Sequence, residues 1–527
     1  MTLQIKKSNN FKFFLILFSL FFVIFLFTSD GHRFTFDEDV AAQQSKRIAT
    51  LSPDPSYVQG ESRLFFEYPW LFPPEYNDRP ICQNAILCSH GTIMHSLTQV
   101  PFIFLNHHFN FIPSGDLWTI DDFDDLHYIT WRNSIDDDLT FMELFYGPFF
   151  SALSICVFFL ISKTYDFSVR TSLILAFLYG LSTLFWAYSQ TSLNTIPVTF
   201  FLLSGFFFYR KFQKTSSHFN LILTGIFFGV AFLTRNDMIL IIIPFFIFLL
   251  INLFMKNIKL KTFFAFVIPV IFSYGFYKIV QYARIGNFGG SAPIETTAIN
   301  HFSLAVTINP YHMQIFGILF SPGAGLFTFA PILLASFVGF FDFYKKNKFD
   351  CFLMISFVTI FILWYSSSVI WHGFNGWGPR YLIPIIPFLI LPLGASIEKR
   401  THISFKLSIV FLGIVGALIN LVYLLQDVSW FVWGFFGSDE RGLYSLARKA
   451  DGNVHDLWIS PLIIWTFEFS QIVQSTLWLF SKPQLDLFLL KIFGIELFMV
   501  SLVVIIPILF FILVKLARNY VDDQLEI

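Results

Sequence analysis

Long runs of apolar residues recur along almost the whole chain, and short polar segments separate them. Because a helix needs about 20 mostly apolar residues to cross a bilayer, the runs predict an all-α, polytopic membrane protein with about 12 spans. One run is interrupted by Ser321-Pro322-Gly323-Ala324-Gly325, which predicts a broken helix. The expected spans cover residues 13–27, 141–162, 171–188, 196–209, 219–233, 238–255, 262–280, 316–343, 351–365, 381–396, 405–425 and 492–514.

Charged residues between the runs predict the side of the membrane on which each loop lies. Cytoplasmic loops carry an excess of Lys and Arg. Here basic residues such as Lys6, Lys163 and Lys515 fall on one side of alternate runs, and the acidic blocks fall on the other. We therefore expect a multi-pass protein of the cell membrane with both termini in the cytoplasm. The first run is followed by no small-x-small cleavage site, so we expect it to stay as an anchor.

Two mixed regions are expected outside the cytoplasm. In the first, the apolar stretch 90–105 is short and holds His and Gln side chains, which favours a helix lying at the interface. The predicted organisation is a tail and first span at 1–28, an extracytoplasmic loop at 29–140, a transmembrane core at 141–425, an extracytoplasmic or interfacial region at 426–490, and the last span and tail at 491–527.

Composition agrees with a membrane protein. Of the 527 residues, 55% are hydrophobic and 13% are charged, against about 25% charged residues in soluble domains. The net charge of −1 argues against a nucleic-acid partner, since no basic face is evident. Cys82 and Cys88 lie in the first outer loop, where either a disulfide or two free thiols is possible. Cys156 and Cys351 fall in apolar runs and are expected to be buried.

Three consecutive carboxylates, Asp37-Glu38-Asp39, follow the first span. Neighbouring acids repel one another, which raises the pKa of at least one of them. Such a cluster at the membrane surface can act as a general base or hold a cation. The alternative is that the acids simply begin a surface helix, because negative charge suits a helix N-terminus.

Cationic and polar groups are also expected on the outer side. Arg380 opens a span after a Gly/Trp-rich turn and can fork onto a phosphate, and Arg235 is a second candidate. The alternatives are snorkelling for Arg380 and an ion pair with Asp237 for Arg235. The broken helix could present N–H groups to an anion, or it could be a simple loop. His372 has no second ligand at metal spacing, so we expect a structural role for it.

These segments, taken in order, resemble the GT-C glycosyltransferases, in particular the protein O-mannosyltransferase and aminoarabinose-transferase branch (glycosyltransferase family 39). The resemblance covers 13–392, and 426–490 has no counterpart. Asn194 departs from the Glu of many relatives, and a Pro-Pro-Gly turn is reduced to Ser89-His90-Gly91. The matching segments are Asp37-Glu38, His90-Gly91-Thr92 through Pro101-Phe102, Tyr188-Ser189-Gln190-Thr191, Leu233-Thr234-Arg235, Phe320 through Phe327, and Gly376-Trp377-Gly378-Pro379-Arg380-Tyr381-Leu382-Ile383-Pro384.

The resemblance implies transfer of a hexose or pentose from a polyprenyl (dolichyl) phosphate to a protein, lipid or glycan acceptor, with inversion and with the active site extracytoplasmic. Asp37 or Glu38 would be the catalytic base. The donor phosphate would be bound by Arg380, Arg235, Ser321 and Gly323. No metal is required by this logic, although a divalent metal is not excluded. Further substrate contacts are expected at Asp39, His90, Gly91, Tyr188, Arg284, Trp377 and Tyr381.

Two other classes compete with an enzyme. A secondary transporter of about 12 helices would carry ionisable residues at mid-membrane, whereas the centres of these runs are nearly all apolar. A GT-C-like scaffold that has lost activity would have the same sequence pattern.

Overall fold

The structure is a computed structural model of the whole chain. It describes residues 2–52, 84–111, 137–286, 311–426 and 461–518, apart from 32, 34, 85, 88, 90, 369–370, 374–375 and 482–484. Cys82, Cys88 and His90 lie outside the described residues, as does the side chain of Asp39. The predicted disulfide and the expected contacts of His90 and Asp39 therefore stay predictions.

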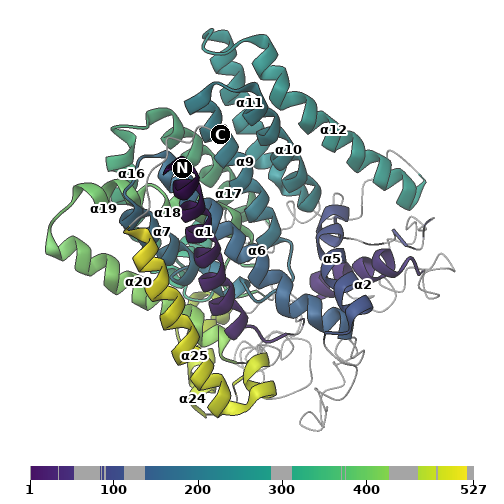
Figure 1. Cartoon of the computed structure of the whole chain (residues 1–527), viewed down its shortest axis with the longest axis vertical. Helices are drawn as coiled ribbons and strands as arrows, with labels where there is room; N and C mark the ends of the chain where they lie inside the picture. The colour runs from purple at the N-terminus through teal and green to yellow at the C-terminus, as the bar shows by residue number, and fades with distance from the viewer. Residues whose placement is uncertain are drawn as a thin grey trace.

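Every regular element in the described part of the chain is a helix (Figure 1). The prediction of an all-α fold is confirmed. The elements are α1 (Thr2–Phe27), α2 (Phe36–Thr50), α5 (Ile93–Phe109), α6 (Asp137–Thr164), α7 (Val169–Leu181), α8 (Leu184–Tyr188), α9 (Thr195–Thr215), α10 (His218–Thr234), η4 (Asn236–Met238), α11 (Ile239–Phe254), α12 (Leu260–Ile285), α14 (Tyr311–Phe320), α15 (Leu326–Phe329), η5 (Pro331–Ala335), α16 (Ser336–Tyr344), α17 (Lys348–Ser366), η6 (Arg380–Ile385), α18 (Ile386–Ile390), α19 (Leu393–Lys399), α20 (Ile403–Leu424), α23 (Pro461–Trp465), α24 (Gln471–Ser481) and α25 (Phe488–Ala517).

Seven segments in the described residues are long and apolar enough to cross a membrane. Four shorter apolar helices accompany them, at Phe11–Phe27, Val169–Leu181, His218–Thr234 and Pro331–Tyr344. The chain is therefore a multi-pass membrane protein, and the count of about 12 spans stays a prediction. The seven long segments are Leu139–Thr164, Asn236–Phe254, Leu260–Arg284, Lys348–Ser366, Arg380–Lys399, Ile403–Leu424 and Phe488–Ala517.

Two expected spans are broken into shorter helices. The run at 171–188 forms α7 and α8, because the hydroxyl of Thr183 accepts a hydrogen bond from the N–H of Phe185 and starts a new helix. The run at 381–396 forms η6, α18 and α19, in which Pro384, Pro387 and Pro392 remove N–H donors from the helical ladder. Apolar length predicted the crossing but not these interruptions.

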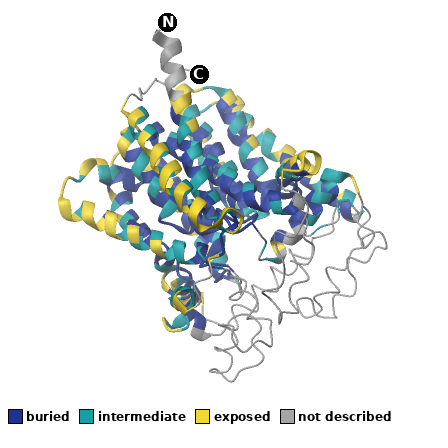
Figure 2. Ribbon diagram, turned by 60° about the horizontal axis from the view of Figure 1, so that its bottom comes forward, coloured by how far each residue is buried: buried dark blue, intermediate teal, exposed yellow. Residues whose placement is uncertain are grey.

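Burial separates central helices from peripheral ones (Figure 2). In the segment Arg380–Lys399, 78% of the most apolar stretch is buried within the protein, whereas in α25 only 11% of that stretch is buried. Helix α25 lies against α1 at the edge of the bundle. The exposed apolar side chains of α25, which include Ile495 and Phe511, would face lipid.

The segment after the first span packs beside the bundle. Helices α2 and α5 lie side by side next to α6 (Figure 1). Helix α5 covers most of the stretch 90–105, for which an interfacial helix was expected, and continues to Phe109. It ends at Asn110, which adopts a left-handed conformation (φ 50°) and donates its N–H to the carbonyl of Asn106.

Candidate active site

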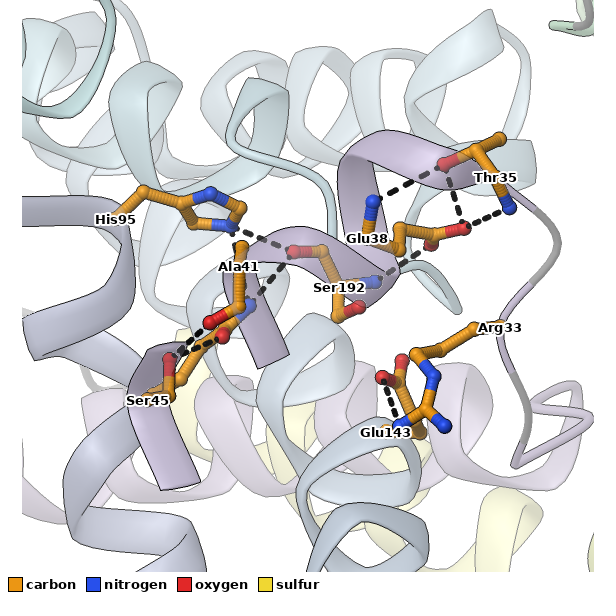
Figure 3. A network of polar contacts seen from close by, with 9 residues as sticks. Arg33, Thr35, Glu38, Ala41, Ser45, His95, Glu143 and Ser192 are labelled. Carbon is orange, nitrogen blue, oxygen red and sulfur yellow. Dashed lines mark hydrogen bonds and ion pairs between the residues drawn. The ribbon is translucent and has the colours of Figure 1, made fainter. Parts of the chain in front are cut away.

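The acidic run forms the N-terminus of α2, and its two described carboxylates have different surroundings. Thr35 caps the helix: its hydroxyl accepts from the N–H of Glu38, and the Glu38 carboxylate accepts from the N–H of Thr35 at 3.0 Å. This reciprocal capping box fixes the start of the helix. Just before it, Arg33 pairs with the buried Glu143 of α6 at 3.8 Å, which holds the connection from α1 against the bundle (Figure 3).

Glu38 is buried, and the chain uses both of its carboxylate oxygens (Figure 3). Besides the capping bonds on Oε2, its Oε1 accepts from the backbone N–H of Ser192 at 3.1 Å. Ser192 lies between α8 and α9, in the polar turn that follows Tyr188. Glu38 thereby ties the start of α2 to that turn.

Asp37 faces solvent and reaches Arg380. Its side chain is 59% exposed, whereas that of Arg380 is 7% exposed. The Oδ2 atom of Asp37 lies 3.1 Å from Nη2 of Arg380, across 343 residues of sequence. The fold thus brings together the acid and the guanidinium that the sequence singled out.

Arg380 directly follows a tight turn that contains Gly373 and Gly378. Gly373 and Gly378 have positive φ angles of 88° and 61°, a region in which glycine is strongly favoured. The backbone N–H of Arg380 donates to the carbonyl of Gly378 at 2.9 Å. Its Nη2 also contacts the Tyr381 hydroxyl at 3.4 Å. Among the described residues, no group accepts a hydrogen bond from the buried Nε of Arg380.

Arg235 lies on the same tyrosine ring as Arg380. Its guanidinium carbon is 5.7 Å from the centre of the Tyr381 ring, and that of Arg380 is 5.1 Å away. Arg235 pairs with Asp237 at 2.8 Å and donates to the Tyr365 hydroxyl at 2.7 Å. The ion pair with Asp237 is therefore present, yet the buried Nη1 of Arg235 has no hydrogen-bond partner in the described part of the chain.

Tyr365 was not predicted from the sequence. Its hydroxyl also donates to the carboxylate of Asp237. Its ring stacks on that of Tyr381, with centres 4.8 Å apart and planes inclined by 5°. A tyrosine at the end of an apolar run is ordinary in a membrane protein, so only the packing reveals its place beside Arg235.

His95 and Gln99 of α5 contact the carbonyl side of the Ser192 peptide, and Figure 3 shows His95 beside Ser192. His95 Nε2 donates to the carbonyl of Ser192 at 2.7 Å, and Gln99 donates to the same oxygen at 3.1 Å. Burial lowers the pKa of His95 to about 4, although the Ser192 hydrogen bond and Asp37 oppose this shift. His95 is therefore neutral near pH 7. The spacing of four residues on one helix face was its only signal in the sequence.

Several predicted substrate contacts have partners within the chain. Arg284 donates to the carbonyl of Leu87 at 2.9 Å and to Gln44 at 3.3 Å, which joins the end of α12 to α2. The hydroxyl of Tyr188 donates to the carbonyl of Trp377 at 3.2 Å, and both side chains are buried. These contacts hold the side chains of Arg284 and Tyr188 against neighbouring elements, and the expected substrate contacts of Arg284, Tyr188 and Trp377 stay predictions.

Gly91 turns the chain before α5, and the next residue, Thr92, contacts the turn that contains Arg235. The N–H of Gly91 donates to the hydroxyl of Ser89 at 2.9 Å. The hydroxyl of Thr92 donates to the carbonyl of Thr234, the residue before Arg235. The predicted interfacial helix therefore begins against the Leu-Thr-Arg turn.

The expectation that Ser321 and Gly323 bind the donor phosphate stays a prediction. The helix is broken as predicted, between α14 and α15, but its N–H groups are occupied. Gly323 N–H donates to the carbonyl of Ile464 at 3.0 Å, and Gly325 N–H donates to that of Ser321 at 2.9 Å. Ala324 N–H donates to the Ser321 hydroxyl at 3.2 Å. These three backbone donors are therefore satisfied within the chain.

Metal-binding groups are sparse in the described residues. No cluster of three or more His, Cys, Asp or Glu side chains there could hold a metal ion. His372 is buried, and desolvation together with the positive charge of Arg380 lowers its pKa to about 3. His372 is therefore a neutral imidazole near pH 7, close to the guanidinium of Arg380.

Known proteins resemble this chain in sequence and in structure. Residues 144–276 match the family described as dolichyl-phosphate-mannose-protein mannosyltransferase. The crystal structure of ArnT from Cupriavidus metallidurans bound to undecaprenyl phosphate is similar, with 12% identity, a TM-score of 0.44, and coverage of 83% of this chain and 71% of ArnT. No curated protein matches the chain in sequence. The residues that match the family lie in the helical core and include Arg235, so the chain is similar to that family over this segment.

Proposed function

We propose that this protein transfers a sugar from a polyprenyl-phosphate carrier to a hydroxyl acceptor outside the cytoplasm, with inversion at the anomeric carbon. The observation that carries the proposal is the contact of 3.1 Å between Asp37 and Arg380. A base for the acceptor and a cation for the leaving phosphate are the two charged groups that such a transfer uses. The family match makes a hexose such as mannose the first candidate for the sugar, and a pentose the second.

Asp37 is the base in this proposal, because its carboxylate is open to an acceptor while that of Glu38 is occupied. It takes the proton of the acceptor hydroxyl as the oxygen attacks the anomeric carbon. The bond from that carbon to the phosphate oxygen breaks, and the electron pair leaves with the lipid phosphate. General-base help of this kind contributes about 10²–10⁴-fold to the rate.

Arg380 and Arg235 bind the phosphate in this proposal. They lie against one Tyr381 ring, and each has a buried N–H group without a partner in the described residues. An unpaired buried donor is costly, and a phosphate oxygen would satisfy it. Charge-assisted hydrogen bonds to the leaving group also stabilise the charge that develops as the sugar departs.

The ion pair must open during the reaction. A contact of 3.1 Å between Asp37 and Arg380 leaves no room for a sugar between the base and the leaving group. Inverting glycosidases must also leave room for a reactant between their two catalytic carboxyl groups, and these groups lie about 6.5–9.5 Å apart. We infer that the donor phosphate takes the place of Asp37 on Arg380, and that this exchange releases the carboxylate to face the acceptor.

The membrane orientation follows the basic residues of the loops. In this proposal both termini are cytoplasmic, the active site faces the outer side of the cell membrane, and the donor enters from the outer leaflet. The matching family is described by a dolichyl-phosphate sugar donor, which supports a polyprenyl phosphate as the carrier. The acceptor is a protein, a lipid or a glycan.

The test uses the full-length protein in detergent with mannose labelled on dolichyl phosphate and on undecaprenyl phosphate, and a membrane extract as acceptor. Arg380→Lys should raise the apparent KM for the donor about tenfold or more, because one ammonium replaces the forked donor. Arg210→Lys is the matched control, since Arg210 is also buried and paired with an aspartate, Asp350. Arg210 lies near the C-terminal end of α9, whereas Ser192, which contacts Glu38, precedes the N-terminus of that helix. Arg210→Lys should transfer sugar at the rate of the unmodified protein.

Other outcomes are distinct. An unchanged donor KM in Arg380→Lys would remove the phosphate role of Arg380. Labelled sugar that crosses vesicles containing the protein without becoming covalently attached would favour the transporter. Folded protein that gives neither result would favour the inactive scaffold. A parallel reaction with EDTA measures whether a divalent metal is needed.

A further inference from the structure

The region 426–490, which has no counterpart in the resemblance, returns to the active site at its C-terminal end. Its described part contains α23 and α24, and α24 packs against α20. Two contacts join it to the site loops. The carbonyl of Ile464 accepts from Gly323 in the broken helix, and Gln471, the first residue of α24, reaches the turn before Arg380.

Gln471 holds that turn with both ends of its amide. Its Oε1 accepts from the N–H of Gly378 at 3.1 Å, and its Nε2 donates to the carbonyl of Gly376 at 3.1 Å. The side chain is buried. A primary amide carries a donor and an acceptor side by side, so it satisfies two backbone groups of one turn at once. No other single contact in the described residues fixes both Gly376 and Gly378 from outside the turn.

The clamped turn determines where Arg380 points. Gly378 is left-handed (φ 61°), and its carbonyl accepts from the N–H of Arg380. Gly376 lies directly against the Arg380 side chain, because a Cβ atom added to this glycine would be 2.8 Å from the Cδ of Arg380. A shift of the turn therefore moves the guanidinium away from Asp37 and from Tyr381.

We propose that Gln471 is a positioning residue for Arg380, and that α24 thereby sets the affinity for the lipid-phosphate donor. The inference rests on the proposed function, because the role given to Arg380 is phosphate binding. The region without a counterpart then has a defined role, since it holds the donor cation in place through the backbone of the Gly-Trp-Gly turn.

The experiment measures binding of undecaprenyl phosphate to the purified full-length protein in detergent. Gln471→Leu removes both amide contacts and should weaken binding about tenfold or more, the effect of a misplaced hydrogen bond to a charged group. The matched control is Gln474→Leu on the same helix, because the Gln474 amide donates to the carbonyl of Glu468 at an exposed position. It should bind as the unmodified protein does.

A double variant separates positioning from general loss of structure. If Gln471 acts through Arg380, then Gln471→Leu should cost nothing further in an Arg380→Ala background, because coupled residues are not additive. An equal loss in both backgrounds would overturn the inference. So would unchanged binding by Gln471→Leu when Arg380→Ala binds more weakly than the unmodified protein. If Gln471→Leu does not fold, Gln471→Asn, which keeps the amide on a shorter arm, decides in the same way.

Failure of the proposed function looks different. Folded, unmodified protein that does not bind undecaprenyl phosphate would remove the donor role, and the inference with it. Normal binding that is insensitive to Gln471 would remove only the inference.

Discussion

Neighbouring carboxylates in one helical turn should respond to amide substitution in opposite ways. Asp37 is exposed, and its ion pair with Arg380 is half open to water. An exposed carboxylate contributes only about 0–1 kcal/mol to stability, and the amide oxygen of an asparagine can still accept from the buried guanidinium of Arg380. Asp37→Asn should therefore leave thermal stability nearly unchanged. It should lower the rate of sugar transfer about 10²–10⁴-fold, because the proposed base is lost.

Glu38→Gln should mainly destabilise the protein. The carboxylate accepts from the N–H and the hydroxyl of Thr35 and from the N–H of Ser192, at 3.0, 3.0 and 3.1 Å. An amide keeps one acceptor oxygen and places an NH₂ group against donors on the other side. A buried donor left without its acceptor costs about 1–3 kcal/mol, and loss of the capping box adds about 1 kcal/mol. The expected loss of stability is about 2–4 kcal/mol.

The assay combines two measurements on each purified variant: the thermal unfolding midpoint in detergent, and the rate of transfer at saturating donor. Asp166→Asn is the control for Asp37→Asn, since Asp166 is an exposed carboxylate that pairs with Lys214 at 2.9 Å. We expect it to change neither quantity. The reasoning is refuted if Glu38→Gln abolishes transfer with an unchanged midpoint while Asp37→Asn remains active, because Glu38 would then be the base.

Two further predictions concern stability. His95 has a folded pKa of about 4 against 6.5 in the unfolded chain, so the unfolded state binds more protons between these values and stability should fall by about 3 kcal/mol as pH drops from 6.5 to 4; His95→Gln should flatten this slope in thermal melts, and an unchanged slope would contradict it. A Cβ atom at Gly323 would lie 2.0 Å from the carbonyl oxygen of Ile463, so Gly323→Ala should displace α23 and lower the unfolding midpoint, whereas Gly275→Ala, with open space around it, should not.

Local composition was enough to predict the helical spans and the broken helix. Apolar runs can satisfy their backbone groups in lipid only as helices, so the spans near α6, α12 and α20 follow from length and hydropathy. Proline and capping residues interrupted the expected spans at 171–188 and 381–396, and their signals were present in the sequence. Length and hydropathy alone predicted continuous spans there, because they do not show that tertiary packing stabilises short helices.

The chemical types of the site were also visible in the sequence, but their division of labour was not. Asp37 and Glu38 are neighbours with nearly the same side chain. One lies on the solvent face and the other is buried against Ser192. Successive residues of a helix point about 100° apart, and only the position of the neighbouring turn decides which of them is occupied. Tyr365 could not be predicted for the same reason, because its place in the site depends on its tertiary contacts with Arg235 and Tyr381.

The sequence by itself determined that the chain is a helical membrane protein with acids after the first span and arginines at later span ends, because hydropathy and charge are local properties. The tertiary structure alone decided that Asp37 meets Arg380, that Ile464 occupies the N–H of Gly323, and that Gln471 clamps the turn before Arg380. These contacts join segments far apart in the chain, and their geometry depends on the packing of all the helices between them.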